Sequence, residues 1–417
     1  MNQALQLQLE QVKKASRSLL TISPEKKNEV LADLSKALKK EAPAILKANA
    51  LDLENFSPDD PLYDRLLLTE ERIGDIAGSL LEVVQFEDPI GEVLEEKELP
   101  NGLKLKKVRV PLGIVAVIYE ARPNVTIDIF ALTWKSGNAC VLKGSRSASH
   151  SNLALVEIIH DTLKKHELPQ EIACLMTLER EETAELLQAH EYIDILIPRG
   201  SKALIDSVRK NSTIPTIETG AGVVHTYFAQ SGNLTKGQNI IENAKTRRTG
   251  VCNALDTLLI DETRMPDLPE LVRPLADKKV EIFADEKAFA SLQESYPSSL
   301  LQQATEEHFG TEFLSLKMSI KTVQNLDEAI DHIGKFSSKH SEAIISEDDQ
   351  EIEKFLQQID AAAVYSNTST AFTDGNQFGM GAEIGISTQK LHARGPMGLK
   401  ELTSYKWIIH GDGQTRP

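Results

Sequence analysis

The chain has 417 residues, of which 41% are hydrophobic and 26% are charged, and its formal net charge is -16. A chain of this length exceeds one ordinary hydrophobic core, so two or three domains are expected. A nucleic-acid-binding surface needs the opposite charge, so we expect no nucleic acid partner. No run approaches the roughly 18 apolar residues of a membrane span, and the N-terminus lacks a basic region followed by an apolar one. We therefore expect a cytoplasmic protein without a membrane partner.

The three cysteines, Cys140, Cys174 and Cys252, are odd in number and far apart. This pattern favours free thiols in a reducing compartment over a disulfide framework. The ten histidines show no HxxxH or HExxH spacing, and no CxxC pair is present. Because these spacings are typical of zinc sites, we expect no metal.

Residues 1–97 have mostly helical patterns. The Ser23-Pro24 pair predicts one helix start and Thr69 predicts another, each before apolar residues at helical spacing. The turn PNG at 100–102 precedes the alternating segment LKLKKVRV, and this combination favours a hairpin at about 98–110. Such a hairpin is either an assembly arm or an ordinary surface hairpin.

From residue 113 onward, apolar runs alternate with helical segments. The strand-like runs are GIVAVIY, NACVLKG, IACLMT, YIDILIP, TIPTIET and VVHTYF, and the clearest helices are expected at about 125–135 and 147–165. Apolar strands that alternate with helices are typical of a parallel sheet covered on both faces, which binds ligands at the carboxyl ends of its strands. A second alternation follows a boundary near 229. We therefore predict an α/β fold with two parallel-sheet domains, in which KWIIHGDG forms the last strand.

Two strand ends carry residues suited to a cofactor, although the dinucleotide fingerprint GxGxxG is absent. VLKGSR ends one strand with Lys143, Ser145 and Arg146. IPRGS ends another with Gly200 and Ser201 and opens a helix, whose N-terminus can hold an anion. The alternative interpretation of each segment is a solvated strand end.

Cys252 lies in RRTGVCNA, after a glycine-containing turn and close behind Arg247 and Arg248. A free cysteine with a pKa of about 8.5 is only a few per cent ionised at neutral pH, and nearby guanidinium groups raise the thiolate fraction. Cys140 and Cys174 lie in apolar strand segments and are expected to be inert. Cys252 is therefore the candidate nucleophile, with a small packed residue at a strand start as the alternative.

Several long blocks resemble the aldehyde dehydrogenase superfamily and, within it, the glutamate-5-semialdehyde dehydrogenase family. The blocks are VPLGIVAVIYEARPNVTID, VLKGS, NAKTRRTGVCNALDTLLI and GAEIGISTQKLHARGPMGL, and the resemblance spans nearly the whole chain. It implies an aldehyde-dehydrogenase-like fold with two Rossmann-like parallel-sheet domains and a small β oligomerisation arm. The expected domains are 1–228 for NADP binding, with the hairpin at about 98–110 as the arm, 229–395 for catalysis, and 396–417 as a C-terminal return with an oligomerisation strand.

The resemblance also implies roles for individual residues. Cys252 takes the nucleophile position, Glu218 in IETG takes the position of a glutamate kept in hydrolytic members, and Asn124 resembles the asparagine that holds an oxyanion. Lys143 corresponds to a lysine that contacts the adenosine ribose, and Arg146 stands where NAD-dependent members often carry glutamate. An arginine there can pair with a 2′-phosphate, which favours NADPH over NADH.

Further contacts follow from the same resemblance. Ser145 belongs to the Lys143 strand end, and Gly200 with Ser201 matches a helix start that faces the cofactor pyrophosphate. Glu307 and Phe309 in EEHFG match a pair that holds the nicotinamide ribose, with Glu312 as a competing position. The charged and polar groups of the substrate need partners, and the candidates are Arg122, Arg247, Arg248, Asn367, Ser369 and Arg394.

The implied reaction is the NADPH-dependent reduction of L-glutamyl 5-phosphate to L-glutamate 5-semialdehyde and phosphate through a Cys252 thioester, the second step of proline biosynthesis. The implied partners are this small-molecule substrate, glutamate 5-kinase as its supplier, and further copies of the chain in a dimer or tetramer. Three alternatives stay open. A hydrolytic NAD(P)-dependent semialdehyde dehydrogenase would use Glu218 to activate water, a cysteine hydrolase would need a histidine beside Cys252, and a scaffold would need Cys252 to be inert.

Overall fold

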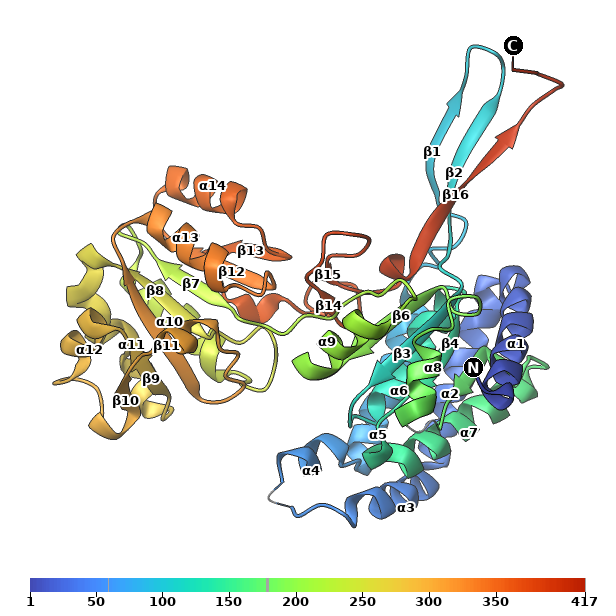
Figure 1. Cartoon of the computed structure of the whole chain (residues 1–417), viewed down its shortest axis with the longest axis horizontal. Helices are drawn as coiled ribbons and strands as arrows, with labels where there is room; N and C mark the ends of the chain where they lie inside the picture. Colours follow the sequence, from blue (N-terminus) through green and yellow to red (C-terminus); the bar gives the residue numbers. More distant parts are fainter. Residues whose placement is uncertain (59, 178–179, 417) are drawn as a thin grey trace. The chain divides into compact units, whose positions relative to one another are not determined.

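The computed structural model describes residues 1–58, 60–177 and 180–416, which form two compact units (Figure 1). Unit 1 consists of residues 1–219, 379–385 and 397–417, and unit 2 consists of residues 220–378 and 386–396. The chain therefore enters unit 2 after Thr219, before the boundary expected at 228, and its last segment returns to unit 1. Pro417, the final residue of the expected segment 396–417, lies outside the described residues.

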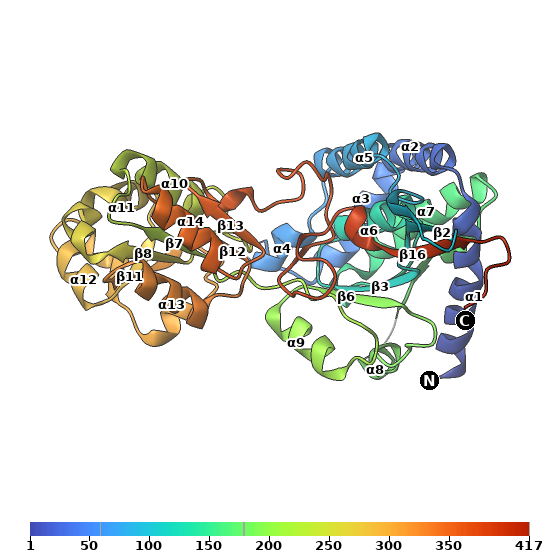
Figure 2. The same ribbon diagram turned by 90° about the horizontal axis from the view of Figure 1, so that it is seen from above.

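Unit 1 begins with helices, as the N-terminal pattern predicts. The Ser23 side chain accepts a hydrogen bond from the Lys26 amide, and Thr69 caps its helix in the same way through the Arg72 amide. These caps satisfy amides that have no partner within the helix, so they fix where the helices begin. Helices α2 and α5 lie side by side (Figure 2). The helices of this region are α1 (Gln3–Ser16), α2 (Pro24–Lys40), α3 (Ala42–Leu53), α4 (Pro61–Leu66) and α5 (Glu70–Gln85).

The core of unit 1 is a parallel sheet of four strands in the order β5-β4-β3-β6. Its strand β3 is buried at every position, as the unbroken apolar run GIVAVIY predicts. Helices connect successive strands, which allows the strands to run in the same direction. The strands are β3 (Ile114–Tyr119), β4 (Ala139–Lys143), β5 (Ala173–Leu175) and β6 (Ile195–Arg199), and the helices are α6 (Asn124–Lys135), α7 (Ser149–Lys165), α8 (Arg180–Leu186) and α9 (Lys202–Asn211).

The strand order of this sheet reverses at β3. The chain moves from β3 outward to β4 and β5 and then crosses to β6 on the other side of β3. In such sheets a ligand binds outside the carboxyl ends of the strands at this switch point. The run TIPTIET, expected to be a further strand, forms bridge residues, such as the isolated bridge between Thr216 and Leu196, but no regular strand. Pro215 lacks an amide hydrogen and cannot donate to a strand ladder, which disfavours longer pairing.

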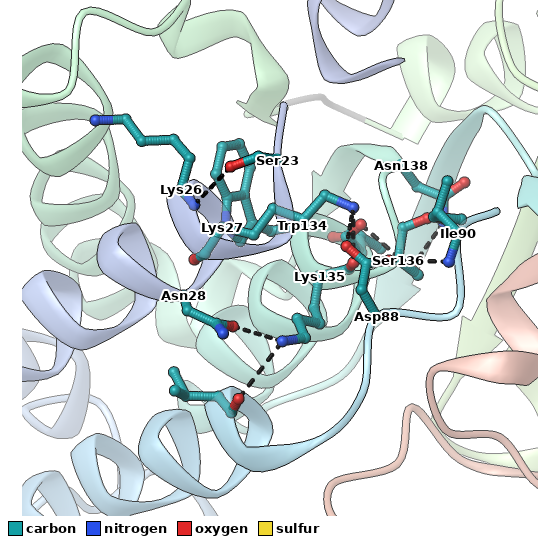
Figure 3. Close-up of polar contacts among 12 residues, drawn as sticks. Ser23, Lys26, Lys27, Asn28, Asp88, Ile90, Trp134, Lys135, Ser136 and Asn138 are labelled. Atoms are coloured by element: carbon teal, nitrogen blue, oxygen red, sulfur yellow. Dashed lines mark hydrogen bonds and ion pairs between the residues drawn. The ribbon is translucent and has the colours of Figure 1, made fainter. Parts of the chain in front are cut away.

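A buried polar cluster joins the N-terminal helices to the sheet layer of unit 1 (Figure 3). The Lys27 ammonium group on α2 donates to the Asp88 carboxylate at 2.7 Å and to the Lys135 carbonyl at 3.1 Å. The Lys135 ammonium group donates to the Asn28 side chain, and burial lowers the pKa of Lys135. A buried charge without partners is costly, so these contacts hold α2, α6 and the loop at Asp88 in one arrangement.

The predicted hairpin is present, and the C-terminal strand extends it. β1 (Val93–Glu98) and β2 (Lys104–Pro111) pair antiparallel, and the turn between them places Gly102 at φ +84°, a conformation that favours glycine. β16 (Thr403–His410) pairs with the other edge of β2, so the predicted last strand is confirmed. Figure 1 shows the three strands as one long ribbon. Large apolar side chains of β16 are exposed, namely Tyr405, Trp407 and Ile409.

Unit 2 is built on a parallel sheet of seven strands in the order β10-β9-β11-β8-β7-β12-β13. The expectation that VVHTYF belongs to the first alternation is wrong, because this run forms β7, which pairs with β8 and β12 of the second sheet. The chain has already entered unit 2 when it reaches this strand. The strands are β7 (His225–Phe228), β8 (Thr257–Asp261), β9 (Glu281–Ala284), β10 (Leu301–Gln303), β11 (Lys317–Val323), β12 (Ser341–Ile345) and β13 (Ala363–Ser366).

Both faces of the seven-stranded sheet are covered, because neighbouring residues of a strand point to opposite sides. On one face, Phe228, Leu258 and Ile260 share a core with α10, α11 and α12. On the other face, Tyr227 and Leu259 share a core with α13 and α14. The helices are α10 (Leu234–Thr246), α11 (Leu268–Asp277), α12 (Glu286–Leu292), α13 (Leu326–Phe336) and α14 (Asp349–Gln358).

Shorter elements complete the described structure. The two-residue strands β14 (Ile386–Ser387) and β15 (Gly395–Pro396) pair antiparallel. The 3-10 helices are η1 (Arg17–Thr21), η2 (Arg146–Ala148), η3 (Gln170–Ile172), η4 (Glu262–Asp267), η5 (Ser298–Leu300), η6 (Glu306–Gly310), η7 (Thr370–Phe372) and η8 (Lys400–Leu402). Among the described residues, no helix is both long enough and apolar enough to cross a membrane.

Candidate active site

Cys252 lies at the amino-end edge of the seven-stranded sheet, in the loop that follows α10 and precedes β8. The loop is tightly packed, since a Cβ atom added to Gly222 would lie 1.6 Å from the Cys252 carbonyl oxygen. The Gly222 amide also donates to the Glu312 carboxylate at 2.7 Å. Only glycine fits against the nucleophile loop at this point.

The three thiols differ in their surroundings. All are outside any disulfide, but Cys140 is buried within β4, and burial raises its pKa to about 12. Cys174 lies within β5, and burial raises its pKa to about 11. Cys252 is half-buried in a loop and not enclosed within a strand. The expectation that Cys140 and Cys174 lie inside strands is confirmed, and Cys252 has the setting that suits a nucleophile.

A histidine that the sequence pattern does not single out lies beside this thiol. The Nε2 atom of His340 is 3.1 Å from the Cys252 sulfur. His340 is fully buried, and burial lowers its pKa to about 4, so its imidazole is neutral at physiological pH. The only signal in the sequence is that this histidine directly precedes an apolar strand, and it is one of ten. The pairing with Cys252 comes from the fold.

A series of hydrogen-bonded hydroxyl groups begins at the His340 imidazole. The Nδ1 atom of His340 lies 2.8 Å from the Ser341 hydroxyl, which lies 2.7 Å from the Thr373 hydroxyl. The Thr373 hydroxyl in turn lies 2.7 Å from the Tyr365 hydroxyl. The side chain of Asn253, the residue after the nucleophile, donates to the main-chain carbonyl of Thr373 at 2.9 Å. The nucleophile loop and the imidazole are thus held by the same segment around Thr373.

Two buried pairs of titratable side chains lie at the same edge of the sheet. Lys245 and Asp256 approach to 3.9 Å, and the Asp256 carboxylate accepts two main-chain hydrogen bonds. Burial raises the pKa of Asp256 to about 7 and lowers the pKa of Lys245 to about 8. The Nδ1 atom of His225 lies 3.1 Å from the Glu342 carboxylate, and both side chains are fully buried. These enclosed pairs hold the strand starts around the nucleophile loop.

The structure separates the two glutamates expected at the nicotinamide ribose. The Glu312 carboxylate accepts a hydrogen bond from the Gly222 amide, and Gly222 packs against the Cys252 carbonyl. Glu307 is exposed in η6, and Phe309 from the same short helix is buried in an aromatic cluster with His332. The fold therefore brings Glu312, and not Glu307, to the Cys252 loop.

Three of the residues expected to contact the substrate lie near Cys252, either in the sequence or in space. Arg247 and Arg248 are exposed directly after α10, at the start of the nucleophile loop. Ser369 is buried and caps η7. The next residue, Thr370, donates to the Asn253 carbonyl at 2.9 Å, so Ser369 is also held close to this loop.

Two other candidates are engaged elsewhere. Asn367 joins the carboxyl ends of β12 and β13 through two hydrogen bonds with the main chain of Ser346. Arg394 lies 2.8 Å from the Asp360 carboxylate. Lys390 and Arg394 together lower the pKa of Asp360 to about 2. Both side chains have partners within the protein, and their contact with the substrate stays a prediction.

In unit 1, the expected cofactor residues lie at the carboxyl end of β4. Lys143 ends this strand, and Arg146 begins η2. Burial lowers the pKa of Lys143 and the Arg146 charge lowers it further, so the two cations lie close together. Ser145 caps η2 by accepting a hydrogen bond from the Ser147 amide at 3.2 Å. Two neighbouring cations at a strand end form a place for an anionic group.

A glutamate that the sequence pattern does not single out lies at the switch point of this sheet. Gly200 and Ser201 follow β6 and precede α9. The Glu120 carboxylate, at the end of β3, accepts hydrogen bonds from the Ser201 amide at 2.9 Å and from the Ser201 hydroxyl at 2.6 Å. The anion position expected at this helix start is thus filled by a carboxylate of the protein itself. An acidic residue directly after the most buried strand was the available signal.

The remaining catalytic candidates belong to unit 1. Asn124 begins α6 and donates to the Asp128 carboxylate at 3.1 Å. Burial raises the pKa of Asp128 to about 6. Glu218 lies 3.7 Å from Arg209 on α9, and Arg122 is half-buried just before α6. Their contribution to chemistry at Cys252, which lies in unit 2, stays a prediction.

Comparison with known proteins supplies the family. The model of the aldehyde dehydrogenase family matches residues 3–285. A gamma-glutamyl phosphate reductase from Pelodictyon phaeoclathratiforme is 58% identical over 417 residues, which is 100% of both chains. The chain belongs to the gamma-glutamyl phosphate reductase family.

Solved structures agree with this assignment. The crystal structure of gamma-glutamyl phosphate reductase from Thermotoga maritima is 40% identical, covers 99% of this chain and 100% of its own, and superposes with a TM-score of 0.95. A glyceraldehyde-3-phosphate dehydrogenase from Methanocaldococcus jannaschii, solved with NADP, covers 98% of this chain and 94% of its own at 18% identity and a TM-score of 0.69, which shows the fold alone. The predicted aldehyde-dehydrogenase-like fold is confirmed, and this gamma-glutamyl phosphate reductase family member is an oxidoreductase.

Proposed function

We propose that this protein reduces L-glutamyl 5-phosphate to L-glutamate 5-semialdehyde and phosphate with NADPH, the second step of proline biosynthesis. The observation that carries the proposal is Cys252, a half-buried thiol outside any disulfide that lies 3.1 Å from a buried imidazole in a tightly packed loop. Relatives that are 54–58% identical over nearly the full length are named for this activity, which supports the same reading.

Cys252 performs the covalent step of the proposed mechanism. Its thiolate attacks the carbonyl carbon of the acyl phosphate, a carbon–sulfur bond forms, and the bond from carbon to the phosphate oxygen breaks. Phosphate departs readily, so one difficult step becomes two easier ones. NADPH, when bound, supplies the hydride that reduces the thioester. Hydride addition leaves an oxyanion on the substrate carbon that is bonded to the Cys252 sulfur. This oxyanion re-forms a carbonyl as the carbon–sulfur bond breaks, which releases the aldehyde and returns the thiolate.

The developing oxyanion needs hydrogen-bond donors. We assign this role to the main-chain amide of Cys252 and to the side chain of Asn124, and one such donor is typically worth about 3–4 kcal/mol of barrier. Glu218 is not required in the reductive direction, because no water has to be activated when phosphate is the acyl partner.

Lys143 and Arg146 support the choice of NADPH. They form a pair of close cations at a strand end, which suits the 2′-phosphate that NADPH has and NADH lacks. Ser145 and Gly200 complete the proposed cofactor surface. Ser201 belongs to it too, but the Glu120 carboxylate must release Ser201 before a pyrophosphate can bind there.

At the nicotinamide ribose we favour Glu312 over Glu307, because the Glu312 carboxylate holds the glycine that packs against the nucleophile loop. For Phe309 we propose the expected contact with the nicotinamide ribose. We propose that the substrate carboxylate and phosphate are bound by the arginines that lie nearest in the sequence to Asn124 and Cys252. These arginines are Arg122, Arg247 and Arg248. We propose that Ser369 binds the amino-acid head of the substrate.

Assembly and location are further parts of the proposal. The ribbon of β1, β2 and β16 exposes apolar side chains of β16, which supports a homo-oligomer that uses this ribbon as its arm. Glutamate 5-kinase, as the source of the acyl phosphate, is the proposed partner. Three cysteines outside any disulfide suit a reducing compartment, so we propose a cytoplasmic location.

Phosphate-dependent reduction of NADP⁺ by L-glutamate 5-semialdehyde, in equilibrium with pyrroline-5-carboxylate, tests the reaction in reverse. We expect NADPH to form only when phosphate is present, with NADP⁺ preferred over NAD⁺. Turnover without phosphate would instead show a hydrolytic dehydrogenase. Thioester hydrolysis without any response to either cofactor would show a cysteine hydrolase, for which His340 supplies the histidine.

A further inference from the structure

We propose that His340, Ser341, Thr373 and Tyr365 form a proton relay, which carries the proton of the Cys252 thiol to solvent and returns it without placing a charge on the imidazole. The inference rests on the proposed function in one respect, since Cys252 must be the nucleophile. His340 touches the reacting sulfur and is a catalytic residue, whereas the three hydroxyl residues act through it as positioning residues.

Every link of the relay is within hydrogen-bond distance. The distances along the chain are 3.1 Å from sulfur to Nε2, 2.8 Å from Nδ1 to Ser341, and 2.7 Å for each of the two hydroxyl contacts that follow. A hydroxyl can donate or accept, so the chain can run in either direction. His340, Ser341 and Thr373 are buried, whereas Tyr365 is half-buried. The path therefore leads from an enclosed imidazole toward the surface.

The proton shifts balance at every link. With the thiol present, the S–H group donates to Nε2, the Nδ1–H group donates to Ser341, Ser341 donates to Thr373, and Thr373 donates to Tyr365, whose own proton points outward. When each proton moves one link along, the S–H bond breaks, an Nε2–H bond forms, and the outer proton of Tyr365 passes to solvent. The imidazole exchanges one neutral tautomer for the other. At the end of turnover the path runs backward and the sulfur regains its proton.

The surroundings favour a path without standing charges. Helices α10 and α13 end before the loops that carry Cys252 and His340, so the carboxyl ends of both helices lie at this edge of the sheet. Burial alone lowers the pKa of His340, which disfavours a resting imidazolium. Burial also raises the pKa of Tyr365, so its hydroxyl stays protonated and passes protons by exchange. A relay of tautomers avoids a charge on the imidazole.

Titratable and charged residues also lie in the segments around this edge of the sheet. They are Arg247 and Arg248 after α10, Lys245 and Asp256 before β8, Glu312 before β11, His225 with Glu342 on β7 and β12, Lys339 before β12, Asp360 before β13, and Asp374 after η7. Variants of the relay hydroxyls leave all of these groups in place. A difference between such variants and the wild type therefore reports the hydroxyl chain.

Hydroxyl deletions test the relay without removing the imidazole. Thr373→Val removes the hydroxyl but keeps the main-chain carbonyl that holds Asn253, and Tyr365→Phe removes the outermost hydroxyl. Thr226→Val is the matched control, because Thr226 is fully buried on β7 and its hydroxyl has no hydrogen-bond partner among the described residues. The measurement is the rate of Cys252 alkylation by iodoacetamide, followed on its own peptide by mass spectrometry across the pH range in which thiols titrate.

We expect Thr373→Val and Tyr365→Phe each to slow alkylation at neutral pH by about tenfold, less than the 10²–10⁴ that a general base typically contributes. The midpoint of the pH profile should move upward in both variants, while Thr226→Val matches the wild type. The kcat of phosphate-dependent NADP⁺ reduction should fall in parallel, with the KM values for phosphate and NADP⁺ unchanged. His340→Gln should show the larger loss, and if it fails to fold, the hydroxyl variants decide the question.

Wild-type alkylation profiles in both hydroxyl variants would overturn the relay, whatever reaction the enzyme catalyses. An equal effect of Thr226→Val would overturn it too, because packing would then explain the change. The proposed reaction fails separately. If the relay variants shift the alkylation profile but the wild type shows no phosphate-dependent NADP⁺ reduction, the relay stands and the reaction is wrong.

Discussion

The two sheets of this protein present their functional groups at opposite edges. In unit 1, Lys143, Glu120 and Ser201 lie at the carboxyl ends of parallel strands, the usual ligand edge of an open α/β sheet. In unit 2, Cys252 and His340 lie at the amino ends, in the loops that enter β8 and β12. The helices run antiparallel to the strands they connect, so the carboxyl edge meets positive helix ends and the amino edge meets negative ones. The first edge suits an anion, whereas the second holds the Cys252 thiol beside a neutral imidazole.

The groups found at each edge agree with this difference. At the carboxyl edge, a carboxylate of the protein occupies the start of α9 where an anionic cofactor group would bind. At the amino edge, the sulfur contacts a neutral imidazole and a chain of hydroxyls. The proposed cofactor edge therefore carries charged groups, whereas His340 and the hydroxyl groups that follow it are neutral. Four substitutions test this contrast.

Cys252→Ser should have the largest effect. We expect phosphate-dependent NADP⁺ reduction to fall by at least about a thousandfold, because a hydroxyl is a far weaker nucleophile than a thiol at neutral pH. NADPH binding, measured by fluorescence titration, should not change, since replacing sulfur by oxygen leaves the proposed cofactor residues Lys143, Arg146 and Glu312 in place. Retention of a tenth of the wild-type rate would remove Cys252 from the chemistry.

Gly222→Ala should come next, because the new Cβ atom overlaps the Cys252 carbonyl and forces the nucleophile loop to move. A displacement of about 1 Å at a reacting group can lower the rate about a hundredfold. Gly250→Ala is the matched control. Gly250 lies in the same loop as Cys252, and a Cβ atom on it meets nothing within 4 Å. Steady-state kinetics and the thermal unfolding midpoint of both variants separate lost activity from lost stability. Equal activity of the two variants would contradict the close approach.

Arg146→Glu addresses the cofactor edge. It replaces a charge-assisted contact by repulsion, and losing a hydrogen bond to a charged group alone costs about 1.5–3 kcal/mol. The preference for NADPH over NADH, as a ratio of kcat/KM values, should therefore fall by at least about tenfold. Arg273→Glu on α11, an exposed arginine of unit 2, serves as the control. An unchanged ratio in Arg146→Glu would place the 2′-phosphate elsewhere.

Glu120→Gln should give the smallest effect, and in the opposite direction. The amide can still accept a hydrogen bond from Ser201 but carries no charge, and neutral hydrogen bonds are roughly half as strong as charge-assisted ones. A cofactor pyrophosphate then competes more easily, so the KM for NADPH should fall by about threefold, a change worth less than 1 kcal/mol. A raised KM would show that Glu120 is itself part of the binding surface.

The sequence predicted local features better than distant pairings. Ser23, Thr69 and the turn at 100–102 act on their own neighbours, so the helix starts and the hairpin were recognised. The run VVHTYF has an unmistakable strand pattern, but that pattern carries no information about which sheet the strand joins. His340 and Glu120 were missed for the same reason, since each owes its role to a residue far away in the chain. The role of a titratable residue at a strand end depends on which residues the fold places beside it.

The path of the chain through the two units also matters while the protein is being made. β2 is the middle strand of its ribbon, yet its partner β16 lies far later in the chain and is synthesised long after it. Synthesis adds about 5–20 residues per second, so one edge of β2 stays open for tens of seconds. An open strand edge can pair with a neighbouring nascent chain, and lysines are a common protection against this. The segment KLKKVRV places three lysines on β2, so side chains of this protective kind lie on the strand whose second edge is covered by β16.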